Sequence, residues 1–378
     1  MALRTKLAAY FLDLINGSSS HCWDRLVLSV LEQASVLYRK GVEKKYRSYA
    51  EHPERQARLD AVVISLGNIT VGGTGKTPAA CMLAQKLQRE GYRTALLNRG
   101  YRSQKEHERA VMSDGRQILL SAAEGGDEAC LMARSLPGIP VVIGRERRQS
   151  GQLAIEQFGS QILLLDDGFQ HWQLHRDLDI VLVDATNPFG NGKLLPRGIL
   201  REPMEHLNRA GLFLITKCDQ ASRETIDDVY GVLRTYNSHA PVAESVHRAK
   251  WCLPFDDWNS MKPREACCVI PDGTKAIAVS ALGNPSSFEK TLRSFGYDVM
   301  NALRYDDHHQ YTPDDMAAMK RAADTAGAVL VTTEKDAVKL NPEWISQYGL
   351  PLYVLGIALE ITKGGDQIDK VLRHVIGG

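Results

Sequence analysis

The sequence lacks the features that mark exported, membrane-spanning and strongly charged chains. Its seven cysteines are odd in number and contain no Cys-x-x-Cys spacing, which favours a reducing compartment over a disulfide framework. No apolar run reaches the roughly 18 to 20 residues needed to cross a bilayer, and the start has no secretory pattern. Lysine and arginine number 46 against 45 aspartates and glutamates, so net charge does not indicate a nucleic-acid binder.

What the chain does have is length and an ordinary globular composition. Its 378 residues allow two or three domains at roughly 100–200 residues each, with cores that need no disulfide. Apolar residues make up 44% and charged residues 24%, which argues against disorder.

The first 50 residues combine two apolar segments with a basic run. Residues 7–15 and 26–38 are apolar, and the second segment has the three- and four-residue spacing of an amphipathic helix. Five lysines and arginines follow within residues 39–47, where Glu43 is the only acid. Either the helix packs on the protein's own core, or it docks on an anionic membrane surface. This segment alone does not decide between the two.

A glycine-rich loop follows the first expected strand. Residues 61–66 form an apolar run typical of a buried parallel strand, and Thr70-Val-Gly-Gly-Thr-Gly-Lys-Thr77 comes shortly after it. The glycines allow unusual backbone angles, Lys76 can reach the β and γ phosphates of a nucleotide, and the Thr77 hydroxyl can bind Mg²⁺. Residue 70 is threonine where the usual signature has glycine. The predicted nucleotide-binding residues are Gly72, Gly73, Thr74, Gly75, Lys76 and Thr77.

Further apolar runs alternate with helical stretches, which predicts a parallel α/β sheet covered by helices. Ligands of such sheets bind at the carboxyl ends of the strands. Asp166 and Asp167 directly follow the run at residues 162–165, where carboxylates can hold Mg²⁺ near bound phosphates. Two acids that merely start a turn are the alternative, and the phosphate loop favours the metal site.

Asp127 and Arg147 are candidates for catalysis at the starts of two expected helices. An acid at position 127 can cap its helix, or it can accept the proton of an attacking hydroxyl. Arg147 can stabilise charge on a transferring phosphoryl group, or it can be a solvated arginine at a helix start. The residues alone leave both pairs of alternatives open.

Thr216-Lys-Cys-Asp219 raises a competing interpretation. It follows the apolar run at residues 211–215 and resembles the guanine-reading element of GTPases, with Ser280-Ala281 as a possible counterpart of their later motif. The alternatives to a kinase are therefore a GTP-binding switch or a deviant-loop ATPase with a protein partner. A second such tetrad at residues 333–336 indicates that the pattern recurs without that meaning.

The set of motifs, in its order, resembles the tetraacyldisaccharide 4'-kinases, which phosphorylate the lipid A precursor at the cytoplasmic face of the Gram-negative inner membrane. The resemblance runs from about residue 60 to 340. Its most specific motifs are Asp166-Asp-Gly-Phe-Gln-His171 and Pro196-x-Gly-x-Leu-Arg-Glu-Pro203. The others are Gly67-Asn68 with Gly72–Pro78, Arg99–Tyr101, Gly126–Glu128, Asp307–His309 and Thr333–Lys339.

The resemblance implies roles for individual residues. The family pairs the aspartate of its Gly-Asp-Glu motif with a histidine of its Asp-His-His motif, for which His308 is the first candidate and His309 the second. Asn98 stands where a serine is expected, which leaves any role of residue 98 open. The implied residues are catalytic Asp127, His308, Lys76 and Arg147, metal-binding Thr77, Asp166 and Asp167, and substrate-binding Arg201, Glu202, Gln170 and His171.

The resemblance also implies the reaction and its setting. It is transfer of the γ-phosphate of ATP, with Mg²⁺ as cofactor, to the 4'-hydroxyl of tetraacyldisaccharide 1-phosphate in lipid A biosynthesis. An acylated substrate lies in the bilayer, so a peripheral (monotopic) enzyme on the anionic cytoplasmic face of the inner membrane is expected. Neither nucleic acid nor an obligate protein partner is expected.

The expected fold is an α/β, P-loop NTPase-type parallel sheet covered by helices, with a second, smaller α/β domain and an N-terminal amphipathic helical segment. Because the family has its site in the cleft between two domains, closure of the cleft would assemble the catalytic pair. The predicted segments are 1–50 for membrane docking, 51–215 for the P-loop kinase domain, 216–350 for the smaller domain, and 351–378 for a C-terminal strand and helix, for which a return to the first domain is one alternative.

Overall fold

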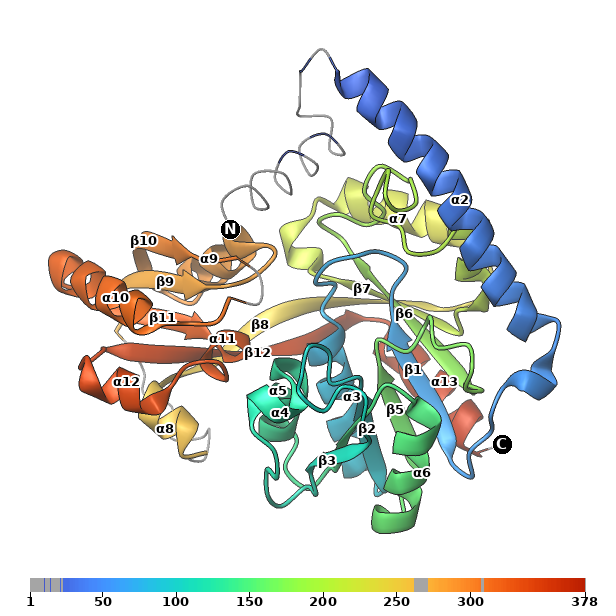
Figure 1. The fold of residues 1–378 in the computed structure, drawn as a ribbon, viewed down its shortest axis with the longest axis horizontal. Coiled ribbons are helices and arrows are strands. Elements are labelled where there is room, and N and C mark those ends of the chain that lie inside the picture. The colour runs from blue at the N-terminus through green and yellow to red at the C-terminus, as the bar shows by residue number, and fades with distance from the viewer. Residues whose placement is uncertain are drawn as a thin grey trace. The chain divides into compact units, whose positions relative to one another are not determined.

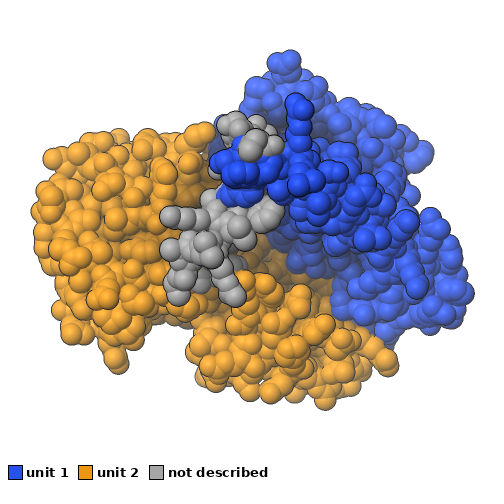
Figure 2. All heavy atoms as spheres, turned by 45° about the horizontal axis from the view of Figure 1, so that its top comes forward, with its two compact units in different colours: residues 1–76, 167–246, 361–378 blue, residues 77–166, 247–360 orange. Residues whose placement is uncertain are grey.

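The computed structural model describes residues 10, 14, 21, 23–261, 271–306 and 309–377. The chain divides into two compact units, each assembled from segments that are distant in sequence (Figure 2). Unit 1 comprises residues 1–76, 167–246 and 361–378, and unit 2 comprises residues 77–166 and 247–360. A compact unit is not the same as an independently folding domain, so the domain boundaries at residues 50, 215 and 350 stay a prediction.

Unit 1 is built on parallel strands. β1 (Val62–Gly67) pairs with β6 (Leu178–Asp184), β6 pairs with β7 (Leu212–Thr216), and β7 pairs with the start of β8 (Val242–Pro254). All residues of β6 and β7 are buried, which explains why their sequences are apolar runs without alternation. The other elements of unit 1 are α2 (Asp24–Ala50), η1 (Pro53–Arg55), η2 (Met204–Arg209), η3 (Cys218–Gln220), α7 (Arg223–Tyr236) and α13 (Gly365–Gly377).

Unit 2 contains two further sets of strands. In the first, β5 (Ile162–Asp166), β2 (Thr94–Asn98) and β4 (Val141–Ile143) are parallel, and β3 (Ala110–Ser113) is antiparallel to β4. In the second, β10 (Asp298–Arg304), β9 (Lys275–Ser280), β11 (Val329–Thr333) and the start of β12 (Leu352–Lys363) are parallel. The helices are α3 (Lys76–Arg89), α4 (Ala122–Gly125), α5 (Asp127–Ser135), α6 (Arg147–Phe158), α8 (Phe255–Asn259), α9 (Pro285–Ser294), α10 (Pro313–Ala326), α11 (Glu334–Ala337) and α12 (Pro342–Gln347).

The predicted fold class is confirmed: the structure is α/β, and its strands are mostly parallel. Each buried apolar run that predicted a strand forms one, because these strands carry their signal in their own composition. β3 and β10 were not predicted. Most residues of β10 are exposed or only partly buried, so its sequence carries no core pattern.

α2, the long blue helix in Figure 1, is mostly exposed. Of its 27 residues only Asp24 and Ser35 are buried, whereas Leu26 and Leu37 are each 70% exposed and Val30 is 61% exposed. The interpretation in which the apolar face packs on the protein's own core is therefore wrong for these three residues. The other apolar segment, residues 7–15, lies outside the described residues except for positions 10 and 14. Among the described helices, none has the length and apolar character to cross a membrane.

Candidate active site

The phosphate loop joins β1 to α3 in the conformation that its glycines allow. Gly72 and Gly75 have φ angles of +117° and +83°, which other residues rarely adopt, while Gly73 does not have a positive φ of this kind. The expectation of unusual angles therefore holds for two of the three glycines. The hydroxyl of Thr74 is buried and has no hydrogen-bond partner among the described residues. A buried donor in such a loop suits a phosphate oxygen.

Asn68 organises the start of the loop from a fully buried position. Its side-chain amide donates to the carbonyl of Thr70 at 2.9 Å and to the Thr70 hydroxyl at 3.0 Å. Its Oδ1 accepts from Lys76 Nζ at 3.2 Å, and its main-chain carbonyl accepts from Gln170 Nε2 at 2.9 Å. Asn68 belongs to the Gly67-Asn68 motif, but that motif alone does not predict this role.

Thr70 stands where the usual signature has glycine. Its backbone does not have a positive φ, so a residue with a side chain fits at this position. Thr70 forms an antiparallel bridge with Leu200 and is only 4% exposed. This bridge brings residues 199–201 beside the start of the phosphate loop. Threonine in place of glycine at residue 70 is therefore compatible with the bridge to Leu200, a contact that the phosphate-loop signature does not predict.

The Thr-Lys-Cys-Asp tetrad after β7 supports the other end of the loop. Thr216 Oγ1 donates to the carbonyl of Thr74, and Lys217 Nζ donates to the carbonyl of Gly73, both at 3.0 Å. Lys217 is buried and is also paired with the carboxylate of Asp184 at the end of β6. Thr216 and Lys217, which resemble a guanine-reading element in sequence, thus hold the main chain of the phosphate loop in this structure.

Asp167 lies between two cationic side chains of unit 1. Its carboxylate accepts from Arg201 Nη1 at 2.8 Å, and Lys76 Nζ is 3.7 Å from the same oxygen. The Asp167 side chain is 38% exposed, and its backbone has φ of +52°. Lys76, Asp167 and Arg201, predicted from three separate motifs, are therefore brought together.

Asp166, which ends β5 in unit 2, is held by the side chain of Asn98 at the end of the neighbouring strand β2. Asn98 Nδ2 donates to Asp166 Oδ2 at 2.9 Å, and Asn98 Oδ1 accepts from the N–H of Gly100 at 2.7 Å. Both side chains are almost fully buried. Residue 98, whose role the sequence left open, orients a predicted metal ligand.

Asp127 and Arg147 are the first residues of α5 and α6 in unit 2. The N-cap of α5 is Gly126, with φ of +97°, so Asp127 is not the capping residue. Arg147 is 4% exposed and donates to the carbonyl of Gly144. The alternative of a solvated arginine at a helix start is therefore wrong. Thr77, also in unit 2, lies in the first turn of α3 and is partly exposed.

His309 is held by three neighbours, whereas His308 lies outside the described residues. His309 Nε2 is 2.9 Å from Asp315 Oδ2. The His309 ring stacks on Tyr305, with centroids 4.7 Å apart, and meets Tyr311 edge-on at 5.3 Å. This packing is typical of a structural histidine, and it leaves His308 as the better candidate for the catalytic partner.

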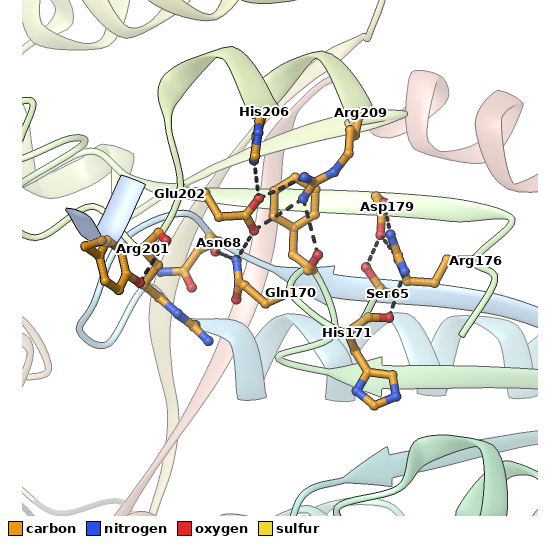
Figure 3. A network of polar contacts seen from close by, with 12 residues as sticks. Ser65, Asn68, Gln170, His171, Arg176, Asp179, Arg201, Glu202, His206 and Arg209 are labelled. Carbon is orange, nitrogen blue, oxygen red and sulfur yellow. Dashed lines mark hydrogen bonds and ion pairs between the residues drawn. The ribbon is translucent and has the colours of Figure 1, made fainter. Parts of the chain in front are cut away.

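Glu202 is the centre of a buried polar network in unit 1 (Figure 3). It accepts from Gln170 Nε2 at 2.6 Å and from Arg209 Nη1 at 2.8 Å, and its Oε2 is 2.7 Å from His206 Nδ1. Burial alone would raise the pKa of Glu202, but the hydrogen bond from His206 and the charge of Arg209 outweigh it and lower the pKa. The His171 ring points away from this network in Figure 3.

Comparison with known proteins gives one consistent result. The family model described as tetraacyldisaccharide-1-P 4'-kinase matches residues 27–376. The chain belongs to this family. A tetraacyldisaccharide 4'-kinase of Halothermothrix orenii is 40% identical over 380 residues, covering 98% of both chains. One of Anaeromyxobacter sp. (strain Fw109-5) is 40% identical over 349 residues, covering 92% of both.

A solved structure agrees with the family. The apo form of LpxK from Aquifex aeolicus in complex with ATP has a TM-score of 0.70 and 26% identity, covering 93% of this chain and 99% of that one. The predicted resemblance is confirmed: the chain is an ATP-dependent kinase of lipid A biosynthesis, a phosphotransferase with a hydroxyl acceptor. A GTP-binding switch and a deviant-loop ATPase are not favoured.

The structure groups some residues of the kinase within each unit. In unit 1, Lys76, Asp167, Gln170, Arg201 and Glu202 are linked through contacts that include Asn68. In unit 2, Asp166 is joined to Asn98. The residues missed by sequence reasoning, Asn68, Asn98 and Lys217, all act on the main chain or on another functional side chain.

Proposed function

We propose that the kinase phosphorylates the 4'-hydroxyl of tetraacyldisaccharide 1-phosphate by direct transfer from ATP, and that Lys76, Asp127 and Arg147 are its catalytic residues. The observation that carries the proposal is the phosphate loop, with Lys76 held between Asn68 and Asp167 and a buried Thr74 hydroxyl available to a phosphate oxygen. Lys76 binds the phosphates of ATP and neutralises charge that develops during transfer.

Asp127 is proposed as the general base. A sugar hydroxyl is a poor nucleophile at neutral pH, so a carboxylate within hydrogen-bond reach raises the rate by accepting its proton, by on the order of 10² to 10⁴-fold. Asp127 is the first residue of α5 and belongs to the Gly126-Asp127-Glu128 motif, which supports this role. His308 is proposed as the orienting partner, since His309 is already held by Asp315. Arg147 is proposed to stabilise the transferring phosphoryl group.

Mg²⁺ is proposed as the cofactor, held by the hydroxyl of Thr77 and the carboxylates of Asp166 and Asp167. These are hard oxygen donors, and Mg²⁺ usually takes only one or two carboxylates beside phosphate oxygens. The Asn98 bond that orients Asp166 is the kind of support that metal-binding carboxylates have. The ion would supply charge neutralisation on the phosphates.

Arg201, Gln170, His171 and Glu202 are proposed to form the substrate side. Arg201 is only partly buried and can exchange Asp167 for an anionic group of the substrate. Glu202 is fully buried with three partners, so its contribution is to hold Gln170 in place rather than to contact the lipid.

We further propose that α2 docks the kinase on the anionic inner face of the membrane. Leu26, Val30 and Leu37 are separated by four and seven residues, which puts them on one side of the helix, and all three are exposed. Exposed basic residues follow toward the end of the helix, where anionic lipid would attract them. They are Lys40, Lys44, Lys45 and Arg47.

The reaction is tested by transfer of label from γ-labelled ATP to tetraacyldisaccharide 1-phosphate in detergent micelles. We expect label in the lipid with ATP and Mg²⁺, and far less with GTP. Asp127→Ala should slow turnover by about 10² to 10⁴-fold with ATP affinity nearly unchanged, whereas Lys76→Ala should reduce both. Hydrolysis of ATP without labelled lipid would contradict the proposal.

Membrane docking is tested by sedimentation with vesicles of phosphatidylglycerol and phosphatidylethanolamine. The double variant Leu26→Ser with Leu37→Ser should reduce the fraction of protein bound to vesicles. Burial of each leucine side chain in the membrane contributes about 2–3 kcal/mol to the free energy of binding. Gln33→Ser, also exposed on α2, is the matched control. Equal binding of all three proteins would rule out docking through this face.

A further inference from the structure

One face of α2 is hydrogen-bonded to the segment that carries the substrate-side residues. Ser35 Oγ donates to the carbonyl of Leu194 at 2.9 Å and accepts from the N–H of Arg197 at 3.0 Å. One turn later, the Tyr38 hydroxyl donates to the carbonyl of Arg201 at 3.0 Å. Burial raises the pKa of Tyr38, so the hydroxyl keeps its proton at neutral pH. α2 thus holds the main chain of residues 194–201 at both ends.

The same segment is bonded to the start of the phosphate loop. The N–H of Arg201 donates to the carbonyl of Ile69 at 2.6 Å, and the N–H of Val71 donates to the carbonyl of Ile199 at 2.8 Å. A shift of residues 194–201 would therefore move the backbone that leads into the loop.

Arg201 continues this connection through its side chain. Its guanidinium binds Asp167, which is also 3.7 Å from Lys76 Nζ. A continuous series of contacts within unit 1 therefore runs from Ser35 and Tyr38 on α2 to the lysine of the phosphate loop. The first steps of this series are hydrogen bonds to the main chain, and only its last two steps, from Arg201 to Asp167 and from Asp167 to Lys76, are partly exposed ion pairs.

The bonded face and the exposed apolar face lie on different sides of α2. At about 100° per residue, Ser35 lies roughly 140–180° around the helix from Leu26, Val30 and Leu37, and Tyr38 lies roughly 80–120° from them. The contacts to residues 194–201 can therefore persist while the apolar face is covered by lipid.

We infer that Ser35 and Tyr38 are positioning residues for phosphoryl transfer, because they set the main chain of residues 194–201 and thereby hold Arg201 against Asp167 beside Lys76. The inference rests on the proposed function for its kinetic consequence. Neither residue contacts substrate; both act through the loop. The helix proposed to bind the membrane is then also the support of the substrate-side loop.

The first test needs no substrate. Hydrogen exchange at the amides of Val71 and Arg201 should be about 5-fold faster in Tyr38→Phe and in Ser35→Ala, since one hydrogen bond of about 1 kcal/mol is lost. Ser35→Thr should restore slow exchange. Tyr49→Phe and Ser29→Ala remove hydroxyls elsewhere on α2 and should leave exchange unchanged. Equal exchange in Tyr38→Phe, Ser35→Ala and the unchanged protein would overturn the inference.

The second test separates positioning from docking and from stability. Tyr38→Phe should lower kcat about 5- to 10-fold at saturating lipid, with vesicle binding unchanged and the melting temperature lowered by about 3 °C. Recovery of kcat at higher surface concentration of lipid would assign the effect to docking and overturn the inference. Absence of transfer by the unchanged protein would overturn the proposed function, whereas transfer unaffected by either substitution overturns only the positioning role.

Discussion

Lys217 donates a hydrogen bond from its Nζ to the carbonyl of Gly73 at 3.0 Å, from a backbone in the left-handed region with φ of +58°. The same ammonium group pairs with Asp184, so the ends of β6 and β7 are both joined to the phosphate loop. A buried lysine is tolerated here because its charge is compensated by a carboxylate and its hydrogen bonds are directed at fixed acceptors. The carbonyls of Gly73 and Thr74 are thus both held by residues that directly follow or end β7.

Loss of this support should weaken ATP binding. Lys217→Met keeps the side-chain volume but removes the bond to Gly73, and we expect the Kd for ATP to rise about 10-fold or more. Thr216→Val removes the bond to Thr74 and a longer one to the carbonyl of Val183, and should raise the Kd about 5-fold. Calorimetric titration with ATP measures both. Lys250→Met, which breaks an exposed pair with Glu360, is the control. Because Lys217→Met leaves Asp184 without its cation, Lys217→Met with Asp184→Asn should be run beside it, and normal ATP affinity in both would contradict the prediction.

Asn98 should control the affinity for Mg²⁺ through Asp166. Asn98→Ala removes the bond that orients the Asp166 carboxylate, and supports of this kind are typically worth 10- to 100-fold, so about 10-fold more Mg²⁺ should be needed for half-maximal activity. The measurement is a Mg²⁺ titration of initial rate at saturating ATP. Asn301→Ala, on the exposed strand β10, should leave the titration curve where it is. A lower maximal rate with the same midpoint would show that residue 98 does not act through the metal.

Glu202 should make stability depend on pH in the acid range. Its pKa in the folded protein lies below the ordinary value of 4.5, so its ionised form stabilises the fold above pH 4.5, and this contribution is lost as pH falls through the folded pKa. Glu202→Gln should cost on the order of 3 kcal/mol at neutral pH, because Arg209 and His206 lose a buried anion. The difference between the two proteins should shrink as pH falls below 4.5, as measured by urea unfolding. A constant difference across this range would indicate that the Glu202 carboxylate is not the stabilising group.

His309 should matter for stability more than for chemistry. Its ring is bonded to Asp315 and packed between Tyr305 and Tyr311, so His309→Gln should destabilise the protein by about 1–3 kcal/mol. Turnover below the melting transition should fall less than about 5-fold, whereas His308→Ala should fall by about 10²-fold or more. Asp315→Asn, which alters the same contact from its other side, should resemble His309→Gln. A larger loss of kcat in His309→Gln than in His308→Ala would reverse the assignment.

The strands, the phosphate loop and the family could be predicted from the sequence because each depends on a local pattern of residues. The run at residues 162–165 indicates a buried strand by composition alone, and Gly72 and Gly75 indicate positive φ by residue type. The pairing of β10 with β9 left no such mark, because most residues of β10 are at least partly exposed.

The supporting contacts of the site could not be predicted, because they join residues far apart in the chain. Lys217 and Gly73 are separated by 144 positions, and Asn98 and Asp166 by 68. Hydrophobic periodicity predicts one helix or strand at a time, and it does not predict which strand ends become neighbours in the fold. The tetrad at residues 216–219 resembles a guanine-reading element in sequence, and only the fold connects it to the phosphate loop.

The contacts between α2 and residues 194–201 constrain the two partners unequally. On the loop side the acceptors are the carbonyls of Leu194 and Arg201, which every amino acid provides. On the helix side the donors are hydroxyl groups that few residue types supply. Side chains of residues 194–201 can therefore be exchanged without loss of these two bonds, whereas Ser35 and Tyr38 cannot be replaced by residues that lack a hydroxyl group.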